Sequence, residues 1–316
     1  MIFQTQIPLS KQKHNQITYN SELLLLGSCF SENIGQKLSY YKFQSIQNPF
    51  GILFHPKAIE LLITNSINKK EYSDTDVFFH NERWHSFEAH SQLSSPSKET
   101  LLNNLNNSIT STFKQLKNAT HLIITLGTSW VYREIASDAL VANCHKIPQK
   151  KFLKELLSID EISESLEGIN TLVKSINPTI TIIHTVSPVR HLKDGFIENQ
   201  QSKAHLLAAI HQVVEPRKNT HYFPSYEIMM DELRDYRFYS EDMIHPNKTA
   251  IDYIWKKFRE VWFSEDTLKT MEEVETIQKG LAHKPFNPNS EAHQLFLKKL
   301  QQKKETLIKA FPFMSF

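Results

Sequence analysis

The stretch LLLLGSCFS, residues 23–31, decides the fold. A run of four leucines without a helical period predicts a short strand that is buried on both faces. Gly27 allows a sharp turn after the strand, and the segment 31–38 has the composition of a helix start. Ser28 would therefore lie between a buried strand and a helix N-terminus, where free N–H groups favour negative charge. Because a Gly-Ser pair alone is more often only a structural turn, a catalytic role needs support from other residues.

The length and composition of the chain limit its class. With 316 residues, of which 40% are hydrophobic and 11% aromatic, it can form one large domain or a domain with an appendage. A formal charge of +2 gives no reason to expect a nucleic-acid partner. Two cysteines make no disulfide framework, the N-terminus lacks a signal-peptide pattern, and no apolar run approaches the roughly 18 residues of a membrane span. We expect a soluble, cytoplasmic protein that does not bind membranes; its oligomeric state stays open.

Apolar runs and amphipathic segments alternate along the chain. The patterns predict strands at 23–26, 43–47, 121–126, 179–185 and 221–223, and helices at 31–38, 56–67, 98–116, 158–176, 198–214, 225–233 and 247–263. A hairpin is expected within an insertion at about 72–92, and a second one at 130–143. Such alternation predicts an α/β domain, residues 1–264, with a mostly parallel sheet covered by helices on both faces. The remaining residues, 265–316, predict two helices at 267–281 and 290–310 that form an extension packed on this domain, with an oligomer contact as the alternative.

Small and polar residues follow three of the predicted strands. They are GS at 27–28, GT at 127–128 and SP at 187–188. In open parallel sheets, ligands bind outside the carboxyl ends of the strands. The three segments should therefore meet at one binding edge.

The segment 240–247, SEDMIHPN, holds the second informative motif. Asp242 and His245 lie three residues apart, just before a helix that Asn247 can cap. A hydrolytic serine needs a base within reach and a carboxylate that orients the base. The sequence thus predicts Ser28 as nucleophile, His245 as base and Asp242 as the orienting carboxylate.

These segments resemble a known family. GSCFS at 27–31 closely matches the signature of the GSCFA family, a bacterial branch that is similar to the SGNH (GDSL-like) hydrolases. The resemblance covers nearly the whole chain through NPFG at 48–51, WHSF at 84–87, NCHKIP at 143–148, VSPVRH at 186–191 and DMIH at 242–245. It implies a three-layer α/β/α sandwich with a flavodoxin-like sheet, ester hydrolysis without a cofactor, and the same roles for Ser28, His245 and Asp242.

The resemblance also implies an oxyanion hole. Gly51 would add a backbone N–H to that of Ser28. The third block of the family reads GTSW at 127–130, without the asparagine that SGNH enzymes carry two residues after the glycine. Thr128 or Ser129, or Asn48 from another loop, would then have to donate. Since losing one donor outright costs about 10²–10³ in kcat, a hydroxyl substitute predicts a working but slower enzyme.

Cys29 is a rival nucleophile, because a cysteine at a helix N-terminus can have a depressed pKa. Adjacent residues that leave a strand point in opposite directions. We therefore expect Ser28 to face the pocket and Cys29 to turn away and pack as a small hydrophobe. Cys144 and His145 form a second possible cysteine–histidine pair.

Other residues have weaker signals. The 15 histidines show no compact ligand spacing such as H-E-x-x-H, so we expect no metal. Trp84, His85 and Arg190 come from segments that could border the same edge, and they are candidate substrate contacts.

The favoured interpretation is a serine esterase that acts on a small-molecule or carbohydrate ester, such as an O-acetyl sugar. Two alternatives stay open. A non-catalytic ligand-binding protein with this fold would account for the missing third-block asparagine. A carbohydrate O-acetyltransferase would use the same acyl-enzyme, with a sugar hydroxyl in place of water.

Overall fold

A five-stranded parallel sheet forms the centre of the computed structural model. The structure describes residues 5–316, so the first four residues of the predicted 1–264 domain lie outside the described residues. The sheet has the order β10-β9-β5-β1-β2. Its strands are β1 (Glu22–Gly27), β2 (Gln44–Gln47), β5 (His121–Leu126), β9 (Thr181–Val186) and β10 (Thr220–Tyr222). Counted in chain order they lie as 2-1-3-4-5, the order of flavodoxin-like sheets, so the strand order reverses beside β1.

The four leucines of β1 divide between the two faces of the sheet. Leu23 and Leu25 belong to one hydrophobic cluster, whereas Leu24 and Leu26 belong to the other. Each is at most 1% exposed. Because successive side chains of a strand alternate, an unbroken apolar run fits a strand with helices on both sides. The predicted doubly buried strand is confirmed.

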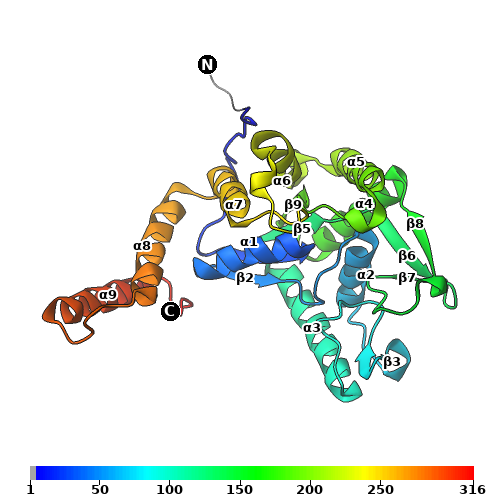
Figure 1. Ribbon diagram of the computed structural model, residues 1–316, viewed down its shortest axis with the longest axis horizontal. Helices are drawn as coiled ribbons and strands as arrows, with labels where there is room; N and C mark the ends of the chain where they lie inside the picture. Colours follow the sequence, from blue (N-terminus) through cyan, green and yellow to red (C-terminus); the bar gives the residue numbers. More distant parts are fainter. Residues whose placement is uncertain (1–4) are drawn as a thin grey trace.

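Helices cover both faces of the sheet, so the predicted three-layer architecture is confirmed (Figure 1). The cluster that contains Leu24 is completed by α2 (Pro56–Ile67), α3 (Lys98–Asn118), α4 (Ile159–Ile176) and α5 (Phe196–Val213). The opposite cluster is built mainly by α1 (Cys29–Tyr40), α7 (Lys248–Trp262) and a π-helical turn (Ile228–Leu233) that follows the short α6 (Ser225–Glu227).

The start of α1 differs from the prediction. The helix begins at Cys29, two residues before the expected start, and Ser28 is its N-cap. The predicted cap of α7 is confirmed, because Asn247 Oδ1 accepts a hydrogen bond from the N–H of Ala250 at 3.1 Å. Both caps lie directly beside the motifs that the sequence singled out.

Two antiparallel units are inserted into the α/β pattern. The predicted hairpin is formed by β3 (Phe78–His80) and β4 (Arg83–His85). The second unit has three strands rather than two: β6 (Trp130–Glu134) pairs with both β7 (Leu140–Val141) and β8 (Phe152–Leu156). The strand β8 was not predicted, because its short sequence FLKEL gives little local signal without its partner β6.

The C-terminal helices extend from the α/β domain (Figure 1). They are α8 (Glu265–Ala282) and α9 (Glu291–Ala310), which confirm the two predicted helices. Their buried apolar side chains belong to the cluster of α1 and α7, and the ring centres of Phe311 and Tyr19 lie 5.1 Å apart. Across the described chain, none of the helices is both long and apolar enough to cross a membrane.

Candidate active site

A cavity of about 810 Å³ opens at the carboxyl edge of the sheet. We call it the site cavity. Its walls include Cys29 at the start of α1, Thr128 after β5, Arg190 after β9, and His245 before α7. Segments that lie far apart in the sequence therefore converge near the reversal of strand order, where open α/β sheets bind ligands.

Ser28 does not face this cavity. Its side chain is 0% exposed, and its Oγ accepts a hydrogen bond from the N–H of Phe30 at 3.3 Å. Its own N–H donates to the carbonyl of Thr125 at 3.0 Å, and its carbonyl accepts from Ser31 at 2.8 Å. Ser28 thus caps α1 from within the protein, and the predicted orientation toward the pocket is wrong.

Cys29 lines the site cavity instead. The alternation of a strand does not continue past Gly27, because its φ of 131° turns the chain and Cys29 is already helical. An added Cβ at Gly27 would lie 2.0 Å from the carbonyl oxygen of Thr125, so only glycine fits this close approach of β1 to β5. The turn therefore directs the second residue after glycine, not the first, to the cavity.

Several groups act on the thiol of Cys29. Burial raises its pKa, and the carboxylate of Glu32 raises it further. The ammonium of Lys203 and the N–H groups of Cys29 and Phe30 lower the same pKa. Burial is the largest of these effects, and on balance the pKa of the Cys29 thiol is raised above its ordinary value, so the thiol is the resting form and a base is needed to ionise it.

His245 and Asp242 form the predicted pair. The distance from His245 Nδ1 to Asp242 Oδ2 is 2.7 Å. The other carboxylate oxygen, Oδ1, accepts hydrogen bonds from the N–H groups of Ile244 at 2.9 Å and of His245 at 3.0 Å. The N–H and side chain of His245, with the N–H of Ile244, lower the pKa of Asp242 to about 2. An ionised carboxylate fixes a proton on Nδ1, which leaves Nε2 of His245 able to accept one.

Arg190 braces the turn that carries this pair. Its N–H donates to the carbonyl of Ile244 at 3.2 Å, and its Nε donates to the carbonyl of Met243 at 3.1 Å. Its guanidinium lies 4.6 Å from the centre of the Tyr239 ring. Arg190 therefore has a structural role, because it holds the turn that carries His245 and Asp242. It also lines the site cavity, and its predicted contact with substrate stays a prediction.

Thr128 is the predicted oxyanion residue that does line the cavity. Its Oγ1 accepts a hydrogen bond from the N–H of Trp130 at 3.0 Å and lies 3.1 Å from Oγ of Ser202. Ser202 Oγ already accepts from the N–H of Ser129 at 2.8 Å. When Ser202 donates to Thr128, the hydroxyl proton of Thr128 is left for a ligand in the cavity.

Gly51 and Asn48 have other partners. The N–H of Gly51 donates to the carbonyl of Asn48 at 2.7 Å, and Asn48 Oδ1 accepts from the N–H of Gly27 at 2.9 Å. Neither residue lines the site cavity, to which this loop contributes Ile52. The N–H of Gly51 is therefore engaged in the turn after β2, whereas the donor group of Asn48, its buried Nδ2, has no partner among the described residues. The predicted oxyanion role of Asn48 stays a prediction.

Comparison with protein families agrees with the sequence motifs. Residues 22–258 match the model described as the GSCFA family. This chain belongs to the GSCFA family. Residues 274–316 match the C-terminal domain of GSCFA domain proteins, which corresponds to the second half of α8 and all of α9. A comparison with curated proteins finds no match to the chain.

Trp84 and His85 of this GSCFA protein lie outside the site cavity. His85 Nδ1 is 2.7 Å from Oγ of Ser94, and Nε2 is 3.0 Å from the carbonyl of His80. Trp84 pairs through its backbone with Ser95. The prediction that both border the cavity is wrong, because their partners are His80 of the hairpin and the following segment at Ser94 and Ser95.

The second cysteine–histidine pair is not assembled for nucleophilic attack. Cys144 lines the cavity, but burial raises the pKa of its thiol to about 11. His145 Nε2 is bonded to the carbonyl of Ser86 at 2.8 Å, and its ring lies 4.6 Å from that of His85. Throughout residues 5–316, no three His, Cys, Asp or Glu side chains are placed to hold a metal ion.

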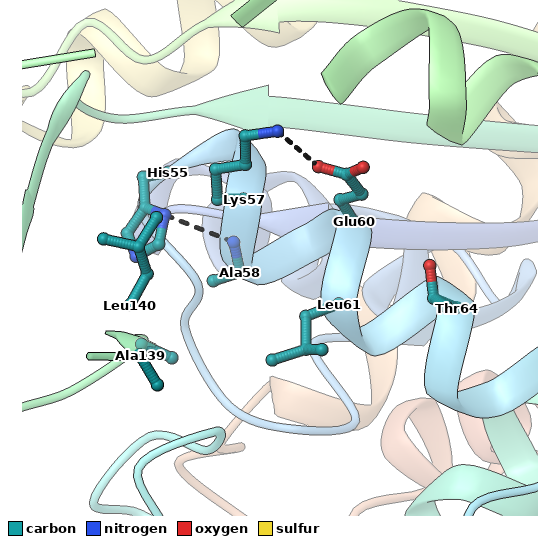
Figure 2. A pocket seen from close by; sticks show the side chains of 9 residues that line it. His55, Lys57, Ala58, Glu60, Leu61, Thr64, Ala139 and Leu140 are labelled. Atoms are coloured by element: carbon teal, nitrogen blue, oxygen red, sulfur yellow. Dashed lines mark hydrogen bonds and ion pairs between the residues drawn. The ribbon is translucent and has the colours of Figure 1, made fainter. Parts of the chain in front are cut away.

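Figure 2 shows a second pocket, of about 340 Å³, along α2. Lys57 and Glu60 pair across it at 3.0 Å, and His55 Nδ1 accepts from the N–H of Ala58 at 3.2 Å. His55 lies between this pocket and the site cavity, and burial lowers its pKa to about 4. It is a neutral helix cap and not a base for the candidate site.

Lys203 was not among the predicted residues. Its side chain is 0% exposed and lies on the buried stripe of α5 with Leu206 and Ile210. Lysine is almost never fully buried without a partner. Its spacing of three and seven residues from these apolar residues is the signal that could have identified it.

Proposed function

We propose that this GSCFA protein is an acyl-ester hydrolase of the SGNH type in which Cys29 replaces serine as the nucleophile. Cys29, at the N-terminus of α1, and His245 line the same cavity, and His245 Nδ1 lies 2.7 Å from Asp242 Oδ2. This convergence of a thiol with a histidine–aspartate pair is the observation that carries the proposal. The flavodoxin-like strand order and the positions of the motifs along the chain add support. We retain the ester-hydrolase prediction with a different nucleophile and a different set of oxyanion donors.

The first half-reaction forms a thioester. His245 Nε2 accepts the proton of the Cys29 thiol, while Asp242 holds the imidazole through Nδ1–H and stabilises the imidazolium. The thiolate attacks the ester carbonyl carbon, and the carbonyl electron pair moves to oxygen. We assign the N–H of Cys29 and the hydroxyl of Thr128, two residues that line the cavity, as donors to this oxyanion. When the intermediate collapses, the C–O bond breaks and His245 returns the proton to the leaving alcohol.

The second half-reaction hydrolyses the thioester. Water enters the position of the departed alcohol, and His245 Nε2 takes a proton from it as it attacks the acyl carbon. The same donors hold the oxyanion, the C–S bond breaks, and Cys29 leaves as a thiolate. His245 then restores the thiol, and the carboxylic acid product is released.

The site cavity favours a small ester with an apolar part. Phe54, Trp130 and Phe152 supply aromatic wall surface, and Arg190 and Lys146 add positive charge. We propose a small-molecule or carbohydrate O-acyl ester as substrate. Because Cys29 is free and must stay reduced to act, we propose the cytoplasm as its compartment.

An open cavity and a formed His245–Asp242 pair argue for catalysis rather than ligand binding alone. The O-acetyltransferase alternative shares the first half-reaction and has no observation of its own in its favour. Adding free sugar to the assay separates the two, because only a transferase converts the sugar to its acetyl ester.

The test is a panel of p-nitrophenyl acetate, p-nitrophenyl butyrate and acetylated monosaccharides. We expect turnover by the unaltered protein and a loss of about 10³-fold or more in Cys29→Ala. Cys144→Ala removes the other thiol of the same cavity and should stay within about threefold of the unaltered rate. No turnover of any ester, or equal rates in Cys29→Ala, would overturn the proposal.

A further inference from the structure

Three positively charged side chains line the site cavity together with Cys29: Lys146, Arg190 and Lys193. None of the three belongs to an ion pair within residues 5–316. The carboxylate on the same lining, that of Asp194, is paired with a lysine from outside it. The chain as a whole is nearly balanced, with 36 Lys and Arg against 34 Asp and Glu. The positive surplus is therefore a local property of this cavity.

The ion pair of Asp194 also joins two walls of the cavity. Its Oδ1 lies 2.6 Å from Nζ of Lys154 on β8, and the same Nζ lies 4.4 Å from the centre of the Trp130 ring on β6. Lys193 directly precedes Asp194 in the turn after β9, and Lys146 lies in the segment that leads into β8. The pair therefore holds the turn that carries Lys193 against the strand that follows the Lys146 segment.

Arg190 is the ordered cation of the three. Its Nε donates to the carbonyl of Met243 at 3.1 Å, and Nη2 donates to the same oxygen. Within residues 5–316, Nη1 has no hydrogen-bond partner. A guanidinium that is already held in place loses little conformational entropy when it pairs with an anion. Lys146 and Lys193 are exposed and add their charges beside it.

Other titratable groups do not offset these charges on the lining. His55 and His191 line the cavity as neutral side chains, because burial lowers their pKa values to about 4 and about 3. Two nearby carboxylates lie outside the lining: Glu32 on α1, and Asp242, which is paired with His245. Among the described residues, the lining itself thus keeps a surplus of three positive charges.

We propose that the site cavity selects an anionic substrate, an ester that also carries a negatively charged group. Lys146, Arg190 and Lys193 attract that group, while the ester carbonyl lies at Cys29. The inference rests on the proposed function for its use in catalysis, and it adds the charge of the substrate. A neutral ester would leave the three cations without a counter-charge, whereas an anionic ester gains Coulomb attraction that water in a cavity screens only in part.

The test compares alkylation of Cys29 by iodoacetate, an anion, with alkylation by its neutral analogue iodoacetamide. In a Cys144→Ala background Cys29 is the one remaining thiol, since the chain has two cysteines. Both reagents react with the thiolate, so the ratio of their rates at one pH does not depend on the ionised fraction. We expect the iodoacetate-to-iodoacetamide ratio to exceed that of the small neutral thiol N-acetylcysteinamide by about threefold, and to fall toward it in about 0.5 M NaCl. A ratio at or below that of the small thiol would overturn the inference.

Neutralising the two exposed lysines locates the attraction. Lys146→Gln and Lys193→Gln should each lower the ratio about twofold, and the double variant about fourfold, through the iodoacetate rate alone. Lys117→Gln is the matched control, because it removes an exposed charge from the last turn of α3, just before β5 begins and thus at the amino edge of the sheet. It should leave the ratio unchanged. An unchanged ratio in the double variant, or an equal fall in Lys117→Gln, contradicts the inference.

A melting curve for each variant shows that it is folded before alkylation. Arg190 stays unaltered, because it braces the turn of His245 and Asp242. Should Lys146→Gln not fold, Lys193→Gln alone is measured with the same expected twofold fall. A Cys29 that neither reagent modifies would contradict both the inference and the proposed function, since it would not be open to the cavity.

Ester turnover is a separate readout. Mono-p-nitrophenyl adipate is anionic, and its methyl ester is a neutral match of similar size. We expect kcat/KM to be about threefold higher for the anion through a lower KM, and the difference to disappear in the Lys146→Gln/Lys193→Gln variant. Equal turnover of the two esters by the unaltered protein would remove the inference and leave the proposed hydrolase. A raised alkylation ratio without turnover of either ester would remove the proposed function and leave the charge selection by the cavity.

Discussion

Replacing Ser28 by alanine distinguishes the helix cap from the nucleophile. The change removes the Oγ that accepts from Phe30 and leaves that N–H inside the protein without a partner. Loss of a serine N-cap costs about 0.5–2 kcal/mol. Because Ser28 is 0% exposed, water cannot replace the lost acceptor, and we expect the upper half of this range, about 1–2 kcal/mol. In a domain of this size that lowers Tm by roughly 2–8 °C.

The expected activity of Ser28→Ala is close to that of the unaltered protein. Cys29, His245 and Asp242 stay in place, so kcat/KM for p-nitrophenyl acetate should fall by no more than about threefold, whereas loss of a nucleophile costs orders of magnitude. Circular dichroism gives the melting curve, and nitrophenolate release gives the rate. Ser158→Ala is the control, because Ser158 caps α4 in the same way. Loss of about 10³-fold in Ser28→Ala, with an unchanged Tm, would refute the assignment of Ser28 as a cap.

Three further outcomes follow from the geometry. Gly27→Ala should lower the free energy of unfolding by several kcal/mol and yield insoluble protein, because the added Cβ would lie 2.0 Å from the Thr125 carbonyl oxygen. Gly168→Ala is the control and should express normally, because the atom nearest to its added Cβ is 3.4 Å away. Asp242→Asn should lower kcat by about 10⁴, because His245 loses the carboxylate that fixes the proton on Nδ1. The rate at which iodoacetamide alkylates Cys29 at high pH should not change. An unchanged kcat would contradict the orienting role of Asp242. The pKa of Asp242 is depressed from 3.8 to about 2 in the folded protein, so its pairing with His245 stabilises the fold above pH 3.8, and this stabilisation is lost as the pH falls toward 2. A ¹³C titration of the Asp242 carboxyl group should show a midpoint near 2. A midpoint near 3.8 would count against the observed hydrogen bonds.

Much of the fold could be predicted because its signals are local. The leucine run of β1, the apolar stripe of α2 and the cap at Asn247 each lie within a few consecutive residues. The strand β8 was missed because its pairing with β6 joins residues far apart in the sequence. Local sequence patterns thus predicted individual helices and strands better than they predicted which strands pair with one another.

The candidate site was predictable only in part. Asp242 and His245 lie in one turn, so their pairing follows from their spacing. Cys29 rather than Ser28 lines the cavity because of the φ of Gly27, which the alternation rule for strands does not include. Lys203 becomes visible only when α5 packs on two strand ends, because its partners are carbonyls of Gly127 and Ser187.

Locating the acyl group on the enzyme tests the central claim most directly. The protein is mixed with p-nitrophenyl acetate, quenched in acid during the first turnovers, digested and mapped by peptide mass spectrometry. The account predicts one added acetyl group on Cys29 that disappears in Cys29→Ala and persists in Ser28→Ala. An acetyl group on Ser28, or none on the segment 27–31, would contradict it.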